Sequence, residues 1–152
     1  KSLVLGGHGD TMVSMLNHTS VDGKPVLDLV KEGTLDKNSL EKIVNRTKSG
    51  GAEIVKLLER GSAFYAPAAS GVEMAESYLK DLKKQLPCAA YLDGEYGIEN
   101  LYAGVPVIIS GKGVEKIIEL TLSPEEKKDF NNSIAAVQDL FSAAKKIDPT
   151  LC

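Results

Sequence analysis

The 152-residue sequence has only two cysteines, no tryptophan and few aromatic residues. Two cysteines cannot build a disulfide framework, so a reducing compartment is the simpler inference. The longest apolar runs are only a few residues, whereas a helix needs about 20 to cross a bilayer, so we expect no membrane partner. No basic-then-apolar leader precedes the first predicted strand, and we therefore expect no export signal.

The sequence also lacks a large excess of acidic or basic residues, with 18 Lys and Arg against 21 Asp and Glu. The formal net charge is -3 and the sequence pI is about 5.4. Nucleic-acid-binding proteins normally carry a basic patch or stripe, so we expect no nucleic-acid partner. The apolar share of 43% and the charged share of 26% are those of an ordinary globular domain.

Metal-ligand spacing is also missing, because neither His-x-x-His nor Cys-x-x-Cys occurs. His8, Asp10 and His18 could be imagined as ligands, but their spacing gives this reading no support. We therefore expect no metal site.

Short apolar or alternating segments predict β-strands. They cover residues 2–5, 12–16, 26–27, 88–92, 105–109 and 115–122. Asp22-Gly23-Lys24-Pro25 is a turn signal, and Gly111-Lys112-Gly113 predicts a hairpin between the last two strands. Pro87 is expected to stop helical structure and introduce the strand that contains Cys88, a predicted core residue.

Start and stop signals predict a first helix from about Asn38 to Gly61. Asn38 can cap it, with Glu41 in the capping-box position. Gly50-Gly51 is expected to kink or break this helix, since glycine costs a helix about 1 kcal/mol relative to alanine.

Two further helices follow. One runs from about Pro67, where proline suits the first turn, to about Lys84. The last begins at Ser123-Pro124-Glu125-Glu126, with serine as the cap, proline at the first position and glutamate at the third. Helical spacing predicts these core faces: Leu40, Ile43, Val44, Thr47, Ile54, Val55 and Leu58 in the first helix; Ala68, Val72, Ala75, Leu79 and Leu82 in the second; Phe130, Ile134, Val137, Phe141 and Ala144 in the third.

Strands joined by hairpins, with the helices grouped apart, indicate the α+β class. We expect an antiparallel twisted sheet with long helices packed on it, forming a single domain over residues 1–152.

The most informative segment is Gly6-Gly7-His8-Gly9-Asp10-Thr11-Met12-Val13, at the end of the first predicted strand. Glycines leave a neighbouring side chain unshielded and permit tight turns, and an imidazole titrates near neutral pH. His8 can therefore meet a ligand from several directions and give or take a proton. Glycine and histidine content alone also allows an ordinary strand-end turn that contains a histidine.

This segment resembles the catalytic-histidine segment of the NAD-dependent malate dehydrogenases that are similar to lactate dehydrogenases. Three further segments agree in the same order, namely residues 60–70 (RGSAFYAPAAS), 86–97 (LPCAAYLDGEYG) and 102–107 (YAGVPV). The match extends to about Lys146. Lactate dehydrogenases usually carry glutamate where Gly7 stands, which favours the malate branch. Residues 14–25 depart from that branch, because the proline usual after Met-Val is missing.

The resemblance implies the C-terminal, substrate-binding half of such an enzyme. His8 would be the proton acceptor and donor in the NAD-dependent oxidation of (S)-malate to oxaloacetate. Ala63 would face the substrate pocket and Pro67 would border the nicotinamide ring, although each could instead serve packing or helix initiation alone. The substrate arginines, the aspartate partner of the histidine and most of the NAD site would lie in an N-terminal half that this chain lacks. The chain alone would then be inactive, and the whole enzyme a cytoplasmic homo-oligomer, dimeric or tetrameric.

The residues agree that the site is incomplete. Oxaloacetate is a dianion, and arginine suits its carboxylates, but the only arginines are Arg46 and Arg60 and nothing in the sequence aims them at His8. No Gly-x-Gly-x-x-Gly follows a strand, so the phosphate-binding turn for a dinucleotide is missing. Asp10 is expected to shape the turn rather than contact the imidazole. Two alternatives stay open: half of a lactate or other 2-hydroxy-acid dehydrogenase, and a non-catalytic association domain.

Overall fold

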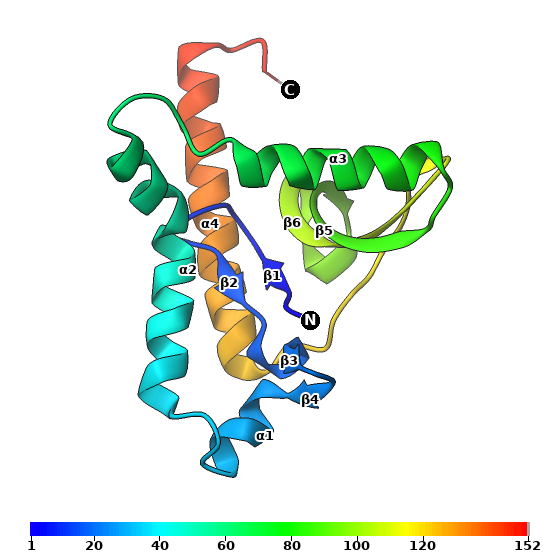
Figure 1. Ribbon diagram of the computed structural model, residues 1–152. Coiled ribbons are helices and arrows are strands. Elements are labelled where there is room, and N and C mark those ends of the chain that lie inside the picture. The colour runs from blue at the N-terminus through cyan, green and yellow to red at the C-terminus, as the bar shows by residue number, and fades with distance from the viewer. Residues whose placement is uncertain (152) are drawn as a thin grey trace.

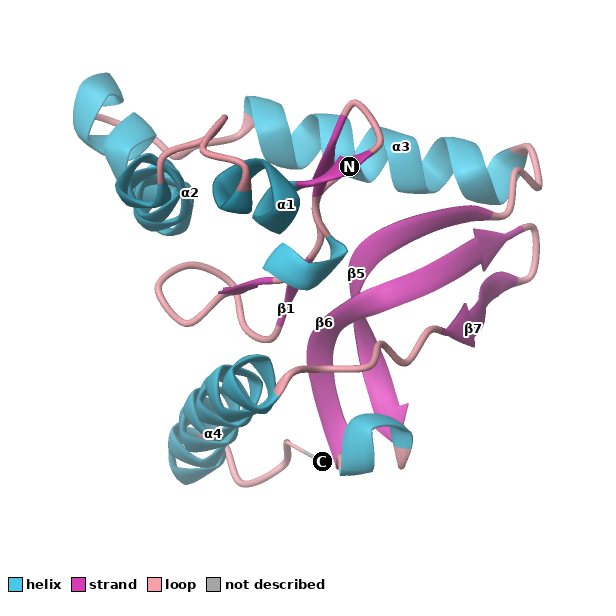
Figure 2. Cartoon of the chain, turned by 90° about the horizontal axis from the view of Figure 1, so that it is seen from below, coloured by secondary structure: helices cyan, strands magenta, loops and turns pink. Residues whose placement is uncertain are grey.

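The computed structural model describes residues 1–151, and Cys152 lies outside the described residues. Its centre is a three-stranded antiparallel sheet of β5 (Lys84–Asp93), β6 (Glu99–Ser110) and β7 (Gly113–Ile117), in the order β5-β6-β7. The two long strands curve strongly (Figure 2). The hairpin predicted at residues 111–113 is confirmed, whereas β7 ends five residues before the predicted end at Leu122.

Four short strands form two small hairpins near the N-terminus. β1 (Val4–Leu5) pairs with β2 (Val13–Ser14), and β3 (Ser20–Val21) pairs with β4 (Lys24–Pro25). The one-turn helix η1 (Leu16–His18) lies between the two hairpins. These hairpins confirm the predicted strands at residues 2–5 and 12–16 in shortened form.

The strand predicted at residues 26–27 is wrong, because Val26 begins a helix, α1 (Val26–Lys31). Pro25 is the N-cap of this helix with φ -56. Proline has a φ suited to the start of a helix and lacks the donor that would continue a strand ladder. Val26 is buried and anchors the short helix.

Three long helices complete the domain: α2 (Lys37–Leu58), α3 (Tyr65–Leu79) and α4 (Pro124–Ile147). A one-turn helix, η2 (Glu95–Gly97), separates β5 from β6. α3 lies beside the sheet and contacts β6, where the Ser77 hydroxyl donates to the Ile109 carbonyl, and α4 lies across the region of β1 and β2 (Figure 1). The ribbons of α2 and α4 overlap in Figure 1 and are separate in Figure 2, and side chains of both helices line shared surface pockets. None of the helices in residues 1–151 is long and apolar enough to span a membrane.

The hydrophobic core lies between the inner face of the sheet, the β1–β2 hairpin and α4. Its buried members are Leu3, Leu5, Val13, Met15, Cys88, Ala90, Leu92, Leu101, Ala103, Val105, Val107, Ile109, Phe130 and Ile134. The burial predicted for Cys88 is thereby confirmed. The α+β class with an antiparallel sheet is confirmed as well.

Helix starts were predicted with unequal success. At α4 the Ser123 side chain accepts from the Glu126 N–H and the Glu126 carboxylate accepts from the Ser123 N–H, which confirms the capping box. At α2 the predicted cap at Asn38 is wrong. Asp36 caps the helix, and its carboxylate accepts from the Ser39 N–H at 2.8 Å. Both residue types cap well, so their spacing could not decide between them.

The helix is not broken at Gly50-Gly51, because α2 is continuous from Lys37 to Leu58. Its C-terminal turns nevertheless change direction in both views (Figures 1 and 2). Glycine pairs are among the usual causes of helix bending.

The second predicted helix was placed too late in the chain. α3 begins two residues before Pro67 and ends at Leu79, and β5 begins at Lys84, so the predicted end at Lys84 is wrong. Pro87 does not introduce the strand but lies inside it, opposite Pro106. β5 is an edge strand, where a residue without an N–H donor is tolerated.

The predicted core face of α4 is confirmed at Phe130, Ile134 and Val137, whereas Phe141 and Ala144 are half-buried and lie outside the core. The core face predicted for α2 is confirmed at Leu40 alone, and that predicted for α3 is wrong. Phe130 and Ile134 are buried and Val137 packs partly buried against the core. In α2 only Leu40 is buried, and in α3 only Ser77. The other predicted positions of α2 and α3 are exposed or half-buried.

Candidate active site

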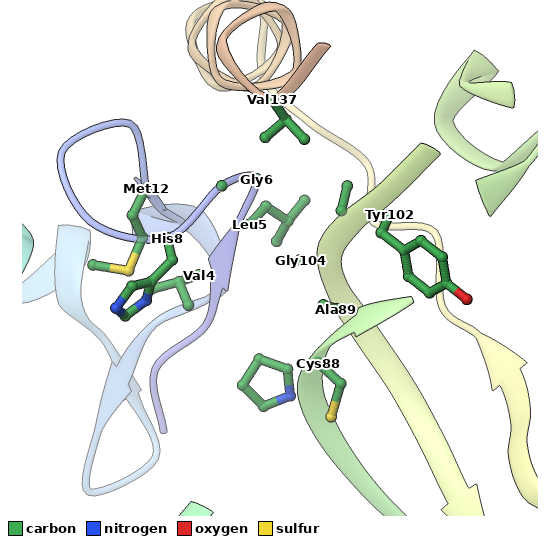
Figure 3. A pocket seen from close by; sticks show the side chains of 13 residues that line it. Val4, Leu5, Gly6, His8, Met12, Cys88, Ala89, Tyr102, Gly104 and Val137 are labelled. Atoms are coloured by element: carbon green, nitrogen blue, oxygen red, sulfur yellow. The ribbon is translucent and has the colours of Figure 1, made fainter. Parts of the chain in front are cut away.

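A cavity of about 390 Å³ lies beside the histidine segment (Figure 3). Strands β1, β5 and β6, the loop after β1 and helix α4 contribute its walls. The lining residues are Val4, Leu5, Gly6, Gly7, His8, Met12, Pro87, Cys88, Ala89, Tyr102, Ala103, Gly104 and Val137. The walls are mostly apolar, and the volume lies in the range of small-molecule sites.

His8 is the only histidine among the residues that line the cavity. It lies on the β1 side of the cavity, near Met12 and Val4, while Cys88, Ala89 and Tyr102 stand on the opposite side (Figure 3). The His8 side chain is exposed and its ring has no hydrogen bond or ion pair with any residue of 1–151. Both ring nitrogens can therefore serve a ligand.

Gly6 fixes the start of the histidine loop to the sheet. The Gly6 N–H donates to the Gly104 carbonyl at 2.9 Å, and the Gly104 N–H donates back to the Gly6 carbonyl at 2.8 Å. Gly6 has φ +89, which favours glycine. A Cβ on Gly104 would lie 2.6 Å from the Gly6 oxygen, so the two backbones can meet only without a side chain there.

A second anchor comes from helix α4. The Gly7 N–H donates to the Ser133 Oγ at 2.8 Å. Ser133 is 1% exposed. Sequence analysis missed this residue, although a serine three residues after Phe130 and one before Ile134 stands on the apolar face of the helix. A buried hydroxyl needs a partner, and that signal could have found it.

Gly7 has little room for a side chain. A Cβ at this position would lie 2.9 Å from the Thr11 Oγ1 and 3.1 Å from a methyl group of Val137. A longer side chain requires Thr11 and Val137 to move. The present arrangement of the loop is therefore compatible with glycine at position 7 without any shift of these two side chains.

The two arginines take no part in the cavity. Arg46 pairs with Glu53 on the surface of α2, with 2.9 Å between Nη2 and Oε1. The hydrogen bond and the charge of Arg46 lower the pKa of the Glu53 carboxyl. Arg60 is exposed in the segment after α2. Among the described residues, no guanidinium lines the cavity.

The other predicted site residues lie away from this cavity. Ala63 is half-buried in the segment between α2 and α3, and Pro67 is exposed in the first turn of α3. Neither lines the cavity. The structure thus brings His8 to a cavity but does not bring Ala63 and Pro67 to it.

Asp10 is exposed and its carboxylate makes no hydrogen bond within residues 1–151. The turn is closed instead by the Met12 N–H, which donates to the Gly9 carbonyl at 3.0 Å. As predicted, Asp10 lies in the turn and does not contact the imidazole, but its carboxylate makes no hydrogen bond that would hold the turn.

His18 has a structural contact, because its Nε2 lies 3.1 Å from the Thr121 carbonyl oxygen. In the described part of the chain, no three His, Cys, Asp or Glu side chains gather as metal ligands. Burial raises the pKa of the Cys88 thiol, which disfavours the nucleophilic thiolate.

Comparison with known proteins identifies the domain. Residues 1–147 match the lactate/malate dehydrogenase, alpha/beta C-terminal domain. The malate dehydrogenase of Pelagibacter ubique is 64% identical over 151 residues, which are 99% of this chain and 47% of that protein.

Solved structures agree in fold. The malate dehydrogenase of Cryptosporidium parvum superposes with a TM-score of 0.93 at 42% identity, covering 96% of this chain and 46% of that one. The lactate dehydrogenase of Eimeria maxima, solved with NADH and oxamate, gives a TM-score of 0.93 at 43% identity, covering 99% and 47%. This chain spans about half the length of each of these relatives. The chain belongs to the lactate/malate dehydrogenase family and corresponds to its C-terminal domain.

Proposed function

We propose that this chain is the substrate-binding and catalytic half of an NAD-dependent malate dehydrogenase, with His8 as the proton acceptor and donor. The observation that carries the proposal is the unpartnered imidazole at the edge of an apolar cavity, on a loop anchored to both the sheet and α4. The identity to a malate dehydrogenase over nearly the whole chain supports it.

The chemistry assigned to His8 is proton transfer. Reduction of oxaloacetate leaves negative charge on the former carbonyl oxygen, and a protonated imidazole within hydrogen-bond reach neutralises it. In the direction of malate oxidation, the neutral imidazole accepts the hydroxyl proton. Because the His8 side chain is exposed in this chain, we assign the exclusion of water from the reacting atoms, which would strengthen such a hydrogen bond, to the assembled enzyme. The coenzyme, when bound, supplies or accepts the hydride.

The residues of this chain do not by themselves fit a dinucleotide. The cavity lining contains no lysine or arginine to meet a pyrophosphate, and no glycine-rich phosphate turn follows a strand. We therefore assign most of the NAD site, the substrate arginines and the carboxylate partner of His8 to an N-terminal half outside this chain. The relative solved with NADH and oxamate, about twice as long as this chain, supports that assignment. In the assembled enzyme, Pro67 borders the nicotinamide and Ala63 faces the substrate.

Malate is the favoured substrate because the identity to a malate dehydrogenase extends over nearly the whole chain. Glycine stands at position 7, where lactate dehydrogenases usually carry glutamate, and a side chain there would require Thr11 and Val137 to shift. A lactate or other 2-hydroxy-acid dehydrogenase is the second candidate, since solved lactate dehydrogenases share the fold closely. A complete enzyme that turns over pyruvate faster than oxaloacetate would replace malate by lactate in this assignment.

We further propose a homo-oligomer in the cytoplasm. The exposed apolar side chains of α2 and α3 support the first part, because monomers rarely expose large apolar surface. They include Ile43, Ile54, Val55, Leu57, Leu58, Val72 and Leu79. The small cysteine content supports a reducing compartment. Sedimentation velocity of the complete enzyme tests the oligomer, and a monomer at micromolar concentration would contradict it.

The decisive experiment is His8→Asn in the complete enzyme. The variant should lose about 10³-fold or more in kcat, since general acid–base catalysis contributes about 10²–10⁴-fold, while its NADH affinity stays near that of the wild type. His18→Asn is the matched control, because His18 contacts Thr121 and does not line the cavity. Equal turnover in the His8 and His18 variants would remove His8 from its role. Absence of malate and oxaloacetate turnover in the wild type would favour the association domain.

A further inference from the structure

We propose that Ser133 on α4 is a positioning residue for His8, acting through the backbone of Gly7. The proposal rests on the proposed function, because it gives Ser133 a part in the proton transfer assigned to His8. Gly7 directly precedes His8, and its N–H donates to the Ser133 Oγ at 2.8 Å. This bond ties the histidine loop to a helix 126 residues further along the chain.

The Ser133 hydroxyl is buried among apolar residues, and it accepts the hydrogen bond of the Gly7 N–H. Ser133 is 1% exposed and lies on the face of α4 that also buries Phe130 and Ile134. A helix position of that kind is normally apolar, and a polar group there is retained only with a hydrogen-bond partner. Removing the hydroxyl would leave the Gly7 N–H without its acceptor.

The loop also rests directly on the serine. A Cβ at Gly6 would lie 2.2 Å from the Ser133 Oγ and 2.7 Å from its Cβ, so only glycine permits this approach. α4 passes over Gly6, and Val137 of the same helix points into the cavity (Figure 3). Gly6 is therefore held between Gly104 of β6 on one side and Ser133 on the other.

These contacts determine where the imidazole stands. The His8 ring has no hydrogen bond or ion pair with residues 1–151, so nothing in this chain holds the ring by its nitrogens. After His8, the loop has only the turn bond from the Met12 N–H to the Gly9 carbonyl. The backbone at Gly7 is thus the nearest fixed point, and Ser133 fixes it.

The consequence is a rate effect rather than a binding effect. Proton transfer needs the imidazole within hydrogen-bond distance of the substrate oxygen, and a misplacement of about 1 Å can cost about 10²-fold in rate. Substrate affinity should change less, because the carboxylate-binding groups are assigned to the other half of the enzyme. Loss of the Ser133 hydroxyl should therefore lower kcat with KM nearly unchanged.

The test uses Ser133→Ala in the complete enzyme, with Ser142→Ala as the matched control on an exposed position of the same helix. Measurements are kcat per active site, KM for oxaloacetate, and the deuterium isotope effect with NADH labelled at the transferred hydrogen. Ser133→Ala should lower kcat about 10- to 100-fold and increase the isotope effect, because slow chemistry then limits turnover. A merely structural role would lower the fraction of folded enzyme and leave both quantities per active site unchanged.

Ser133→Cys keeps the size of the side chain but offers sulfur, a weak acceptor, and serves if the alanine variant does not fold. Its kcat should lie between those of the wild type and the alanine variant. Wild-type kcat and isotope effect in the folded variants would overturn the role of Ser133 while leaving the proposed function intact. If the wild type and Ser142→Ala both fail to turn over malate or oxaloacetate, the proposed function and this inference fall together.

Discussion

Helices α4 and α2 are similar in length but differ in what surrounds them. α4 spans 24 residues and buries Glu126, Phe130, Ser133 and Ile134. α2 spans 22 residues and buries Leu40 alone. α4 packs against the core, with the Phe130 ring 5.2 Å from that of Tyr96. α2 lies away from the sheet (Figure 2), and its Val44 and Lys48 line surface pockets that α4 also borders.

Both helices have an apolar stripe at helical spacing, so the stripe alone does not decide burial. Spacing predicts that a helix forms and which side is apolar. What covers that side depends on elements far away in sequence, or outside the chain altogether. For α4 those elements are β2, β6 and the histidine loop. In α2, Leu40 is the one buried residue, and Val44 is half-buried beside β2 and α4.

The largest expected difference between the two helices comes from one substitution made in each. Ile134→Ala should lower the free energy of unfolding by about 2–5 kcal/mol, because it deletes buried methyl groups and leaves a cavity. Ile43→Ala should change it by about 0.5 kcal/mol or less, since Ile43 is 56% exposed. Urea unfolding of this chain and both variants measures the difference. Equal losses would mean that the isolated chain covers α2 after all.

The helix caps should respond differently to charge removal. Burial alone would raise the pKa of Glu126, but hydrogen bonds from Ser123 and Asn17 outweigh it and the pKa is lowered. The ionised carboxylate therefore stabilises the fold above about pH 4.3, the ordinary glutamate value, and this contribution is lost as the pH falls through the lower folded-state value.

Glu126→Gln should accordingly cost about 1–2 kcal/mol at pH 7, since hydrogen bonds to a charged group are at stake. The difference from the wild type should close as the pH falls below about 4. Asp36→Asn at the cap of α2 is the matched control, and asparagine caps as well as aspartate, so little change is expected. Urea unfolding at several pH values measures the free energy of unfolding of both variants. If the loss in Glu126→Gln did not depend on pH, the ionised carboxylate would not be its cause.

A substitution at Gly50 in α2 is expected to raise the free energy of unfolding, whereas the substitutions above lower it. Nothing lies within 4 Å of a Cβ built on Gly50 or Gly51. Gly50→Ala should therefore stabilise this chain by about 0.5–1 kcal/mol through helix propensity. Gly104→Ala is the contrasting variant, because its Cβ would lie 2.6 Å from the Gly6 oxygen and should destabilise. Urea unfolding compares the two variants with the wild type, and a loss of stability in Gly50→Ala would show that the bend in α2 is required.

Local signals in the sequence predicted much of the fold and the location of the site. The capping box at Ser123, the hairpin at residues 111–113 and the burial of Cys88 each depend on residues close together in the chain. The His8 segment carries its own glycines, and the structure places it at a cavity. Such features depend on interactions between residues close together in the chain, and these can be predicted from a single sequence.

Long-range contacts could not be predicted in the same way. The anchors at Gly104 and Ser133 join the histidine loop to residues about 100 positions away, and no spacing rule links them. Residues 26–27 were expected as a strand because a two-residue apolar run fits either structure. The predicted core faces of α2 and α3 assumed a cover that this chain does not supply.

The smallest expected effect on stability comes from an exposed residue of α2, and it tests whether another part of the enzyme covers this helix. Leu57 is 76% exposed near the end of α2, so Leu57→Ser should change the stability of the isolated chain by about 0.5 kcal/mol or less. In the complete enzyme the same substitution should cost more, about 1 kcal/mol or above, if another half or another copy covers this face. Thermal unfolding of both proteins with and without the substitution gives the comparison. An equally small effect in both would mean that the end of α2 stays exposed. The difference between α4 and α2 would then belong to the fold of this domain rather than to the absence of the proposed N-terminal half.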